Sequence, residues 1–256
     1  MSFLLNLIPR IYLIQIGEWF RPLLGFLFLG DQFLDPITGK KYRYFFSYGY
    51  HQKRKSVLSP GSFSLERHRL MQLYLQKETP FFQSEKPLKV LHIAPEQCFV
   101  YRFRILSHLD YITLDLESPL ADVKADICDL PFEDNRFDVV FCNHVLEHIK
   151  DDQKAISEIY RVLKNKGWAI LQVPMDYQKE ETFEDPTITD KEERIRLFGQ
   201  YDHLRVYGKD YYQRLSKFGF EVKKWSVQEN FSAQEIQLMA LDPAEVLPVV
   251  FKNNSL

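Results

Sequence analysis

From about Lys86 onward, short apolar runs alternate with amphipathic stretches. Short runs bounded by polar residues and turn signals predict buried strands, and the stretches between them predict helices. This alternation is typical of a doubly wound, Rossmann-like α/β sheet. The predicted strands are Lys89–Ala94, Tyr111–Leu116, a weaker one around Val123, Phe137–Cys142, Trp168–Val173, Phe220–Val227 and Val246–Lys252. The sequence thus predicts a mostly parallel, seven-stranded sheet, with a short helix over Ala233–Leu241 before the last strand.

One helix in this region is strongly marked. Residues Asp152–Lys164 place a set of apolar side chains on a single stripe at helical spacing. The set comprises Ala155, Ile156, Ile159, Tyr160 and Leu163. Residues 165–167, ending in Gly167, predict a left-handed C-cap that ends the helix and turns the chain into the next strand.

The first thirty residues are apolar but are interrupted by Arg10, Glu18 and Arg21. These charges come too early for a membrane span, and the start lacks the basic residues and cleavage site of a signal peptide. Two interpretations remain. In one, two helices, broken near Pro22 and ended at Gly30, pack on the main domain; in the other, a helix lies in a membrane interface. Four aromatic residues suit both, namely Trp19, Phe20, Phe26 and Phe28.

Length and composition narrow the class of protein. The 256 residues carry 33 Lys and Arg against 35 Asp and Glu, a net charge of -2, so no global field attracts nucleic acid or anionic lipid. The three cysteines are scattered, which excludes a disulfide-stapled scaffold and fits a reducing, cytoplasmic setting. We expect an accessory region over residues 1–84 and a main domain over residues 85–256.

The carboxyl ends of the parallel strands predict the binding edge, because ligands of such sheets bind outside those ends. Two carboxylates, Asp115 and Asp126, follow the second and third strands. Ribose hydroxyls and an adenine amine are donors that pair with such carboxylates. The candidate binding residues are His92, Ala94, Pro95, Glu96, Asp115, Leu116, Asp126, Ile127, Asn143 and His144.

The residues between Lys89 and Val173 resemble the class I S-adenosylmethionine-dependent methyltransferases of type 11. The resemblance is carried by Ala125-Asp-Ile-Cys-Asp-Leu-Pro-Phe-Glu-Asp-Asn-Arg-Phe-Asp-Val-Val140, by His144-Val-Leu-Glu-His-Ile149 and by Ile159-Tyr-Arg-Val-Leu-Lys164. It implies that Asp115 holds the ribose and Asp126 the adenine amine of S-adenosylmethionine, with S-adenosylhomocysteine as product. The chain departs from the family at His92-Ile-Ala-Pro-Glu-Gln-Cys98, where a glycine-rich loop is usual.

A subgroup with His-x-Ala-Pro-Glu at that loop is similar to this chain at two further motifs. These are Ser64-Leu-Glu-Arg-His-Arg69 and Phe198-Gly-Gln-Tyr-Asp-His-Leu-Arg-Val-Tyr-Gly208. In that subgroup the preceding segment is a zinc ribbon with two cysteine pairs. Here the matching positions are Asp35, Thr38, Ser59 and Ser62, so residues 33–64 resemble a degenerate ribbon that binds no zinc. A helix over residues 65–77 follows it.

Basic and aromatic residues alternate within the ribbon-like segment, from Lys40 to Tyr48 and from His51 to Lys55. Aromatics between basic residues can stack on nucleic-acid bases. The favoured alternative is a β-ribbon whose aromatics fill its core, because the cluster is short and the chain is slightly acidic. We therefore expect no nucleic-acid partner.

The candidate catalytic residues are His203, His144 and Arg205. His203 and Arg205 lie in the long connection over residues 175–208, which predicts a lid, with a helix opened by a capping box at Thr189–Glu192. A histidine titrates near neutral pH and can act as a base, and Arg205 could orient an anionic acceptor. His144 and His148 have the i, i+4 spacing of metal ligands, but with no further ligand nearby in sequence we expect no metal.

The resemblance therefore implies a methyltransferase that transfers a methyl group to an O, N or C atom of an unidentified acceptor. The alternative is a catalytically silent scaffold of the same fold that binds a membrane or a partner through residues 1–30. The sequence does not indicate the acceptor or the oligomeric state.

Overall fold

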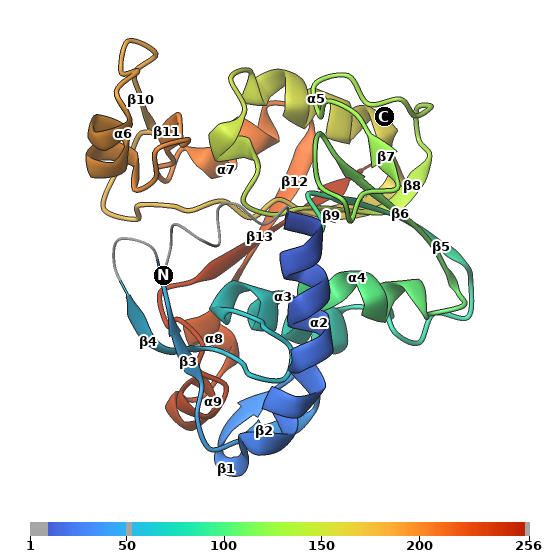
Figure 1. Ribbon diagram of the computed structural model, residues 1–256. Coiled ribbons are helices and arrows are strands. Elements are labelled where there is room, and N and C mark those ends of the chain that lie inside the picture. Colours follow the sequence, from blue (N-terminus) through green and yellow to red (C-terminus); the bar gives the residue numbers. More distant parts are fainter. Residues whose placement is uncertain (1–9, 50–52, 254–256) are drawn as a thin grey trace. The chain divides into compact units, whose positions relative to one another are not determined.

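The computed structural model describes residues 10–49 and 53–253 (Figure 1). These residues form two compact units, which we describe separately. Of the described residues, the first contains 10–49, 53–85, 96–106 and 225–246, and the second contains 86–95, 107–224 and 247–253. The chain is therefore not divided by a single cut near residue 85, because two later segments group with the N-terminal part.

A seven-stranded sheet forms the second unit, as the sequence predicts. Its strand order is β12-β13-β9-β8-β5-β6-β7. The neighbours among β5, β6, β7, β8 and β9 run parallel, whereas β13 runs antiparallel to β9. The strands are β5 (Leu88–Ile93), β6 (Leu109–Asp115), β7 (Val123–Lys124), β8 (Phe137–Cys142), β9 (Leu163–Ile170), β12 (Phe220–Ser226) and β13 (Val246–Lys252).

Helix α5 (Asp152–Val162) packs on this sheet and lies on the same side of it as α7 (Tyr211–Ser216) (Figure 1). The Asp151 carboxylate accepts a hydrogen bond from the Lys154 amide at 2.9 Å and caps the first turn. Ala155, Ile156 and Ile159 are fully buried in the core, as the stripe predicts.

The end of α5 differs from the prediction. The helix stops at Val162. Leu163 is already the first residue of β9 and pairs with Phe137 of β8. The left-handed residue of the following turn is Lys166, with φ of 65°, rather than Gly167. Gly167 is needed for another reason: a Cβ there would lie 2.8 Å from the Lys164 carbonyl oxygen and 3.0 Å from that of Asp138.

The long connection after β9 contains β10 (Phe183–Glu184), α6 (Lys191–Phe198) and β11 (Arg205–Val206). Its helix begins one residue later than predicted, because Asp190 and not Thr189 is the N-cap and accepts the Glu193 amide at 2.9 Å. Both ends of the connection are joined where Met175 bridges Tyr207.

Helix α2 (Arg10–Leu27) of the first unit is continuous through Pro22, so the predicted break there is wrong. A proline removes one backbone donor without ending the helix when the turns on both sides hold. Residues 1–9, the rest of the predicted apolar segment, lie outside the described part of the chain. Within that part, we find no helix with the length and apolar character needed to cross a membrane.

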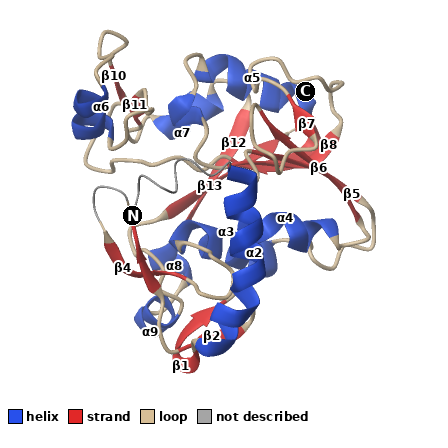
Figure 2. Cartoon of the chain, viewed as in Figure 1, coloured by secondary structure: helices blue, strands red, loops and turns tan. Residues whose placement is uncertain are grey.

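The other elements of the first unit are short apart from one helix (Figure 2). Helix α3 lies where the sequence predicts a helix over 65–77, and α9 is shorter than the predicted 233–241. The elements are β1 (Leu29–Asp35), β2 (Lys40–Tyr42), β3 (Phe46–Tyr48), β4 (Arg54–Leu58), α3 (Glu66–Glu78), α4 (Gln97–Arg104), α8 (Val227–Asn230) and α9 (Ala233–Leu238).

Aromatic residues of the ribbon-like segment divide between core and surface. Tyr42 and Phe45 are buried, and Phe45 stacks on Phe33 with the ring centroids 5.0 Å apart, whereas Tyr44 is exposed. Tyr42 also requires the glycine at Gly61, since a Cβ there would lie 1.8 Å from the Tyr42 hydroxyl oxygen. The buried rings of Tyr42 and Phe45 thus serve packing, whereas Tyr44 and Tyr48 lie at the surface.

A buried hydrogen-bond network joins the two turns of this segment. The fully buried Asp35 carboxylate accepts bonds from the Ile37 amide at 2.9 Å and from the Ser59 hydroxyl at 2.7 Å. The Ser59 oxygen in turn accepts the Gly61 amide at 3.2 Å. Polar side chains therefore accept hydrogen bonds from backbone amides in both turns.

We expect Ser59→Ala to lower the free energy of unfolding by about 1–3 kcal/mol, because it leaves one oxygen of buried Asp35 without its donor. Urea unfolding measures the change. The control, Ser47→Ala, removes an exposed hydroxyl from β3 and should change the free energy by less than about 0.5 kcal/mol. Equal effects of the two substitutions would show that the Asp35–Ser59 bond contributes nothing.

Candidate functional site

A cavity of about 130 Å³ lies at the carboxyl ends of β5 and β6, within the second unit. It is at the sheet edge where the sequence predicts a ligand. Its walls are apolar apart from two carboxylates. The lining residues are Ile93, Ala94, Leu114, Asp115, Leu116, Ala125, Asp126, Ile127, Val145 and Ile149.

Both carboxylates are fixed by backbone amides of the turns that follow them. Asp115 accepts hydrogen bonds through Oδ1 from the Glu117 amide at 2.8 Å and from the Ser118 amide at 2.7 Å. Asp126 accepts the Cys128 amide through Oδ1 at 2.8 Å. In each case the backbone amides bond to Oδ1 and not to Oδ2, so Oδ2 faces no amide of the turn and suits a donor on a ligand.

The apolar walls suit a flat heterocycle. Leu116 lies beside the cavity with 64% of its surface exposed, while Ile127 is buried. An exposed leucine next to an apolar hollow gains from covering by an aromatic ring. The cavity is smaller than the roughly 300–1,000 Å³ of a complete small-molecule site, so it can take only part of a nucleoside cofactor.

Ala94 follows β5 in the left-handed region, with φ of 50°, and its amide donates to the Leu114 carbonyl at 2.8 Å. Glycine adopts this conformation without cost, whereas other residues pay about 1–2 kcal/mol. The loop thus keeps the backbone shape that glycine favours although the chain has alanine there.

We expect Ala94→Gly to raise the free energy of unfolding by up to about 1 kcal/mol, since the relief of strain exceeds the added entropy of the unfolded chain. Urea unfolding gives the measurement. The control is Ala155→Gly, in helix α5, which should lower the free energy of unfolding by at least about 1 kcal/mol. A loss of that size from Ala94→Gly would contradict the proposed strain.

Five predicted binding residues do not line this cavity: His92, Pro95, Glu96, Asn143 and His144. His92 is fully buried within the sheet, and its Nδ1 lies 2.7 Å from the Tyr111 hydroxyl. Glu96 belongs to the first unit, where it is the N-cap residue of α4 and lies 4.0 Å from His68 Nε2. Pro95 and Asn143 are buried. The cofactor role is therefore not supported for His92 and Glu96.

His144 and His148 are not successive turns of one helix, contrary to the prediction. Only Leu146–His148 form a short 3-10 helix (η1), and His144 precedes it with φ of 54°. The His144 Nδ1 lies 3.4 Å from Oε1 of Glu147, a residue that the sequence did not mark. Burial raises the pKa of Glu147, but the rings of His144 and His148 lower it by more, so the net shift is downward and the carboxylate is ionised.

His203 is 4% exposed and lies against this group, with its ring centroid 4.7 Å from that of His148. Its Nδ1 donates to the Phe198 carbonyl at 2.9 Å, which leaves the lone pair on Nε2. Burial lowers the pKa of His203, so the ring is neutral. Because Nε2 is buried, we do not retain the prediction that His203 is a base acting directly on an acceptor.

Arg205 makes structural bonds in this fold, and these do not support the predicted role of orienting an acceptor. Its side chain donates to the carbonyls of Leu146, Ile149 and Lys150 at 2.6–3.1 Å. Nε donates to the Glu184 carboxylate at 2.8 Å. These bonds occupy most of the guanidinium donors and fasten η1 to the connection.

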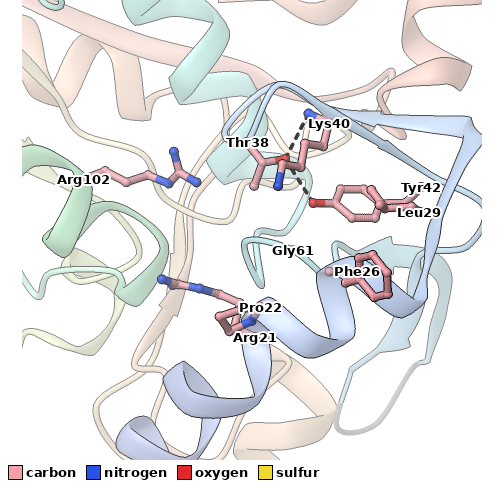
Figure 3. Close-up of a pocket in the computed structure, with 10 residues that line it drawn as sticks. Arg21, Pro22, Phe26, Leu29, Thr38, Lys40, Tyr42, Gly61 and Arg102 are labelled. Carbon is pink, nitrogen blue, oxygen red and sulfur yellow. Dashed lines mark hydrogen bonds between the residues drawn. The ribbon is translucent and has the colours of Figure 1, made fainter.

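A second cavity, of about 210 Å³, lies in the first unit (Figure 3). Arg21, Lys40 and Arg102 give it positive charge, and the Thr38 hydroxyl contacts the Tyr42 hydroxyl at 3.3 Å. Arg21 is already paired with Glu18 at 2.6 Å. This cavity offers no carboxylate to a nucleoside, so the sheet cavity is the candidate cofactor site.

Part of the chain is similar to known proteins. Residues 103–171 match the model of a methyltransferase domain, type 11. An uncharacterized protein of Methanocaldococcus jannaschii is 47% identical over 76 residues, which cover 29% of this chain and 33% of that protein. The 2-phytyl-1,4-naphtoquinone methyltransferase of Nostoc punctiforme is 42% identical over 45 residues, covering 18% of this chain and 20% of that enzyme.

Among solved structures, the cyclase SpnF has the same fold, with a TM-score of 0.51 and 14% sequence identity. That likeness covers 94% of this chain and 96% of the cyclase. The curated relatives are matched over only a fifth to a third of their length. The family match therefore covers part of the sheet domain, residues 103–171, and not the rest of the chain.

Proposed function

We propose that this protein, whose sheet domain is of the class I S-adenosylmethionine-dependent methyltransferase type, transfers a methyl group from S-adenosylmethionine to an O, N or C atom of an acceptor. The observation that carries the proposal is the cavity at the carboxyl ends of β5 and β6, with Asp115 and Asp126 on its wall. The match of residues 103–171 to the methyltransferase domain supports it.

The residues of the cavity fit the nucleoside part of that cofactor. Asp115 would accept bonds from the ribose hydroxyls and Asp126 from the adenine amine, each through the oxygen that its turn does not use. Leu116 and Ile127 would cover the adenine ring. When bound, the sulfonium supplies the methyl group and the leaving group, so the protein mainly positions the two partners.

The fold alone does not decide between catalysis and a silent scaffold, because a cyclase shares it. Isothermal calorimetry with S-adenosylmethionine and S-adenosylhomocysteine separates the two. An active enzyme should bind both, and adenosine should compete, since the cavity takes that part of the molecule. If none of the three compounds binds, the proposed activity is wrong and the catalytically silent scaffold is the better interpretation.

We also propose that the polar network of Asp35, Thr38, Ser59 and Ser62 replaces the metal of a zinc ribbon at residues 33–64. The support is that the Asp35 and Ser59 side chains, at positions where the subgroup has cysteines, bond to each other and to the turn amides. Oxygen side chains of serine and threonine are poor zinc ligands. The experiment is Ser59→Ala, described above.

A second function is favoured by one face of α2, which we propose contacts a membrane interface. Trp19 and Phe26 are 88% and 71% exposed, and other large apolar side chains continue the face along the helix. These are Tyr12, Ile16, Phe20, Leu23 and Leu27. The opposite face holds Ile14, which is buried, and Glu18, which accepts a bond from Gln97 at 2.7 Å. Aromatic residues on one face of a helix are typical of interfacial binding.

We expect the protein to cosediment with vesicles of phosphatidylcholine and phosphatidylglycerol. Trp19→Ser combined with Phe26→Ser should weaken the partition at least about tenfold, since each side chain contributes about 1.5–3 kcal/mol when buried. Tyr101→Ser, at an exposed aromatic on α4, is the control. Equal partition of the double variant and the parent would exclude α2 as the contact.

A further inference from the structure

Three side chains of the second unit converge on one point. One ligand atom each from Glu147, His148 and His203 lie within 4.8 Å of one another. Two imidazoles and a carboxylate are the ligand set of open zinc sites and of other divalent transition-metal sites. The group is brought together by the fold, because His203 lies 55 positions beyond His148 in the sequence.

The buried carboxylate lacks the partners that it needs. Glu147 is 1% exposed, and among residues 10–49 and 53–253 neither oxygen accepts a hydrogen bond of normal geometry. The His144 Nδ1 lies 3.4 Å from Oε1 but makes no hydrogen bond to it. An ionised carboxylate in such surroundings is costly unless a cation faces it.

Both histidines are held in the tautomer that a metal requires. The Nδ1 of His203 donates to the Phe198 carbonyl at 2.9 Å, and the Nδ1 of His148 lies 3.3 Å from the Asp202 carbonyl oxygen. A nitrogen that faces a carbonyl carries the proton, so Nε2 of each ring keeps its lone pair. Metal-binding histidines usually donate their other N–H to a carbonyl or carboxylate in this way. The Asp202 carboxylate lies 3.5 Å from the same His148 Nδ1, which adds negative charge beside the ring but no second hydrogen bond.

The backbone around the group is fixed. The Leu204 amide donates to the Glu147 carbonyl at 2.9 Å, which joins the segment of His203 directly to η1. Arg205 adds its bonds to the carbonyls of Leu146 and Ile149. The His148 side chain is 32% exposed, so the group remains open to solvent.

We propose that Glu147, His148 and His203 bind one divalent transition-metal ion, with Zn²⁺ the ion that suits the set best. The three residues leave a coordination position for water or for a group of the acceptor, as in zinc sites with three protein ligands. This proposal does not depend on methyl transfer, since a metal can bind here whether or not the protein binds S-adenosylmethionine.

The test uses tag-free full-length protein, stripped with a chelator and dialysed. Calorimetry and elemental analysis should give one equivalent of Zn²⁺, Mg²⁺ should not compete, and Co²⁺ should give the visible absorption of a tetrahedral site. Glu147→Gln and His148→Asn should each weaken Zn²⁺ binding at least about tenfold. Glu147→Gln keeps the shape of the side chain, and circular dichroism verifies that both variants fold.

His108→Asn is the matched control, because His108 is a half-buried histidine of the same unit outside the group. It should bind Zn²⁺ as the parent does. The proposal is overturned if the parent binds no Zn²⁺. It is equally overturned if Glu147→Gln and His148→Asn bind it as tightly as the parent, or if several equivalents bind weakly to every variant.

Discussion

Arg69→Ala should lower the free energy of unfolding of the first unit by about 4 kcal/mol or more. The Arg69 side chain is fully buried on α3 and donates to the carbonyls of Val57, Ser64, Met239 and Ala240 at 2.6–2.9 Å. Removing it leaves these carbonyls without donors, at about 1–3 kcal/mol for each that stays buried, and opens a cavity. Burial lowers the pKa of Arg69 to about 10, so the group is still charged at neutral pH.

Urea unfolding followed by tryptophan fluorescence measures the loss, because Trp225 belongs to the same unit. Arg69→Lys should recover only part of the stability, since an ammonium has three donors and lacks the planar fork. Arg54→Ala, which removes an exposed arginine 3.5 Å from Glu66, should cost less than about 1 kcal/mol. If Arg69→Ala resembled that control, the four carbonyls would have found other partners.

Arg69 also shows what a motif can and cannot reveal. The sequence marks Ser64 to Arg69 as a subgroup motif but does not say what it does. In the structure His68 accepts the Leu65 amide at 3.0 Å at the start of α3, and Arg69 joins α3 to residues that lie 170 positions away in sequence. Local patterns carry no information about such distant partners, so this role could not have been predicted.

The sheet was predictable because its strands are marked by local hydrophobicity. Strand β8 matches the predicted Phe137–Cys142, and β5 differs by one residue at each end. The break at Pro22 was wrong because a proline's effect depends on what holds the adjoining turns. The early end of α5 depends on the pairing of Leu163 with Phe137, which local helical periodicity cannot show.

The candidate site was predictable only in part, because some of its contacts join residues that are distant in the sequence. Asp115, Leu116, Asp126 and Ile127 follow strands whose ends are set by topology, and the structure brings them to one cavity. The bonds of Arg205 could not be predicted, because its partners include backbone carbonyls at η1, which no side-chain pattern displays. Glu147 was missed although it lies between the two histidines of His144-Val-Leu-Glu-His148, since only the fold shows that it is buried.

Asp115→Ala should weaken binding of S-adenosylmethionine about 10- to 100-fold. The proposed bond between the carboxylate and the ribose hydroxyls is charge-assisted, and its loss costs about 1.5–3 kcal/mol. Calorimetry with S-adenosylhomocysteine gives the same comparison without turnover. The substitution also removes the acceptor of the Glu117 and Ser118 amides, so part of the loss could come from a changed turn.

Asp115→Asn separates the two causes, because the amide oxygen can still accept the two backbone bonds while the charge towards the ribose is gone. We expect it to lose most of the affinity that Asp115→Ala loses, with no change in the urea midpoint. Asp129→Ala removes an exposed carboxylate that follows β7 but does not line the cavity, and it should bind like the parent. If Asp115→Asn bound the cofactor as tightly as Asp129→Ala, the ribose would lie elsewhere, and the weaker binding of Asp115→Ala would reflect the turn alone.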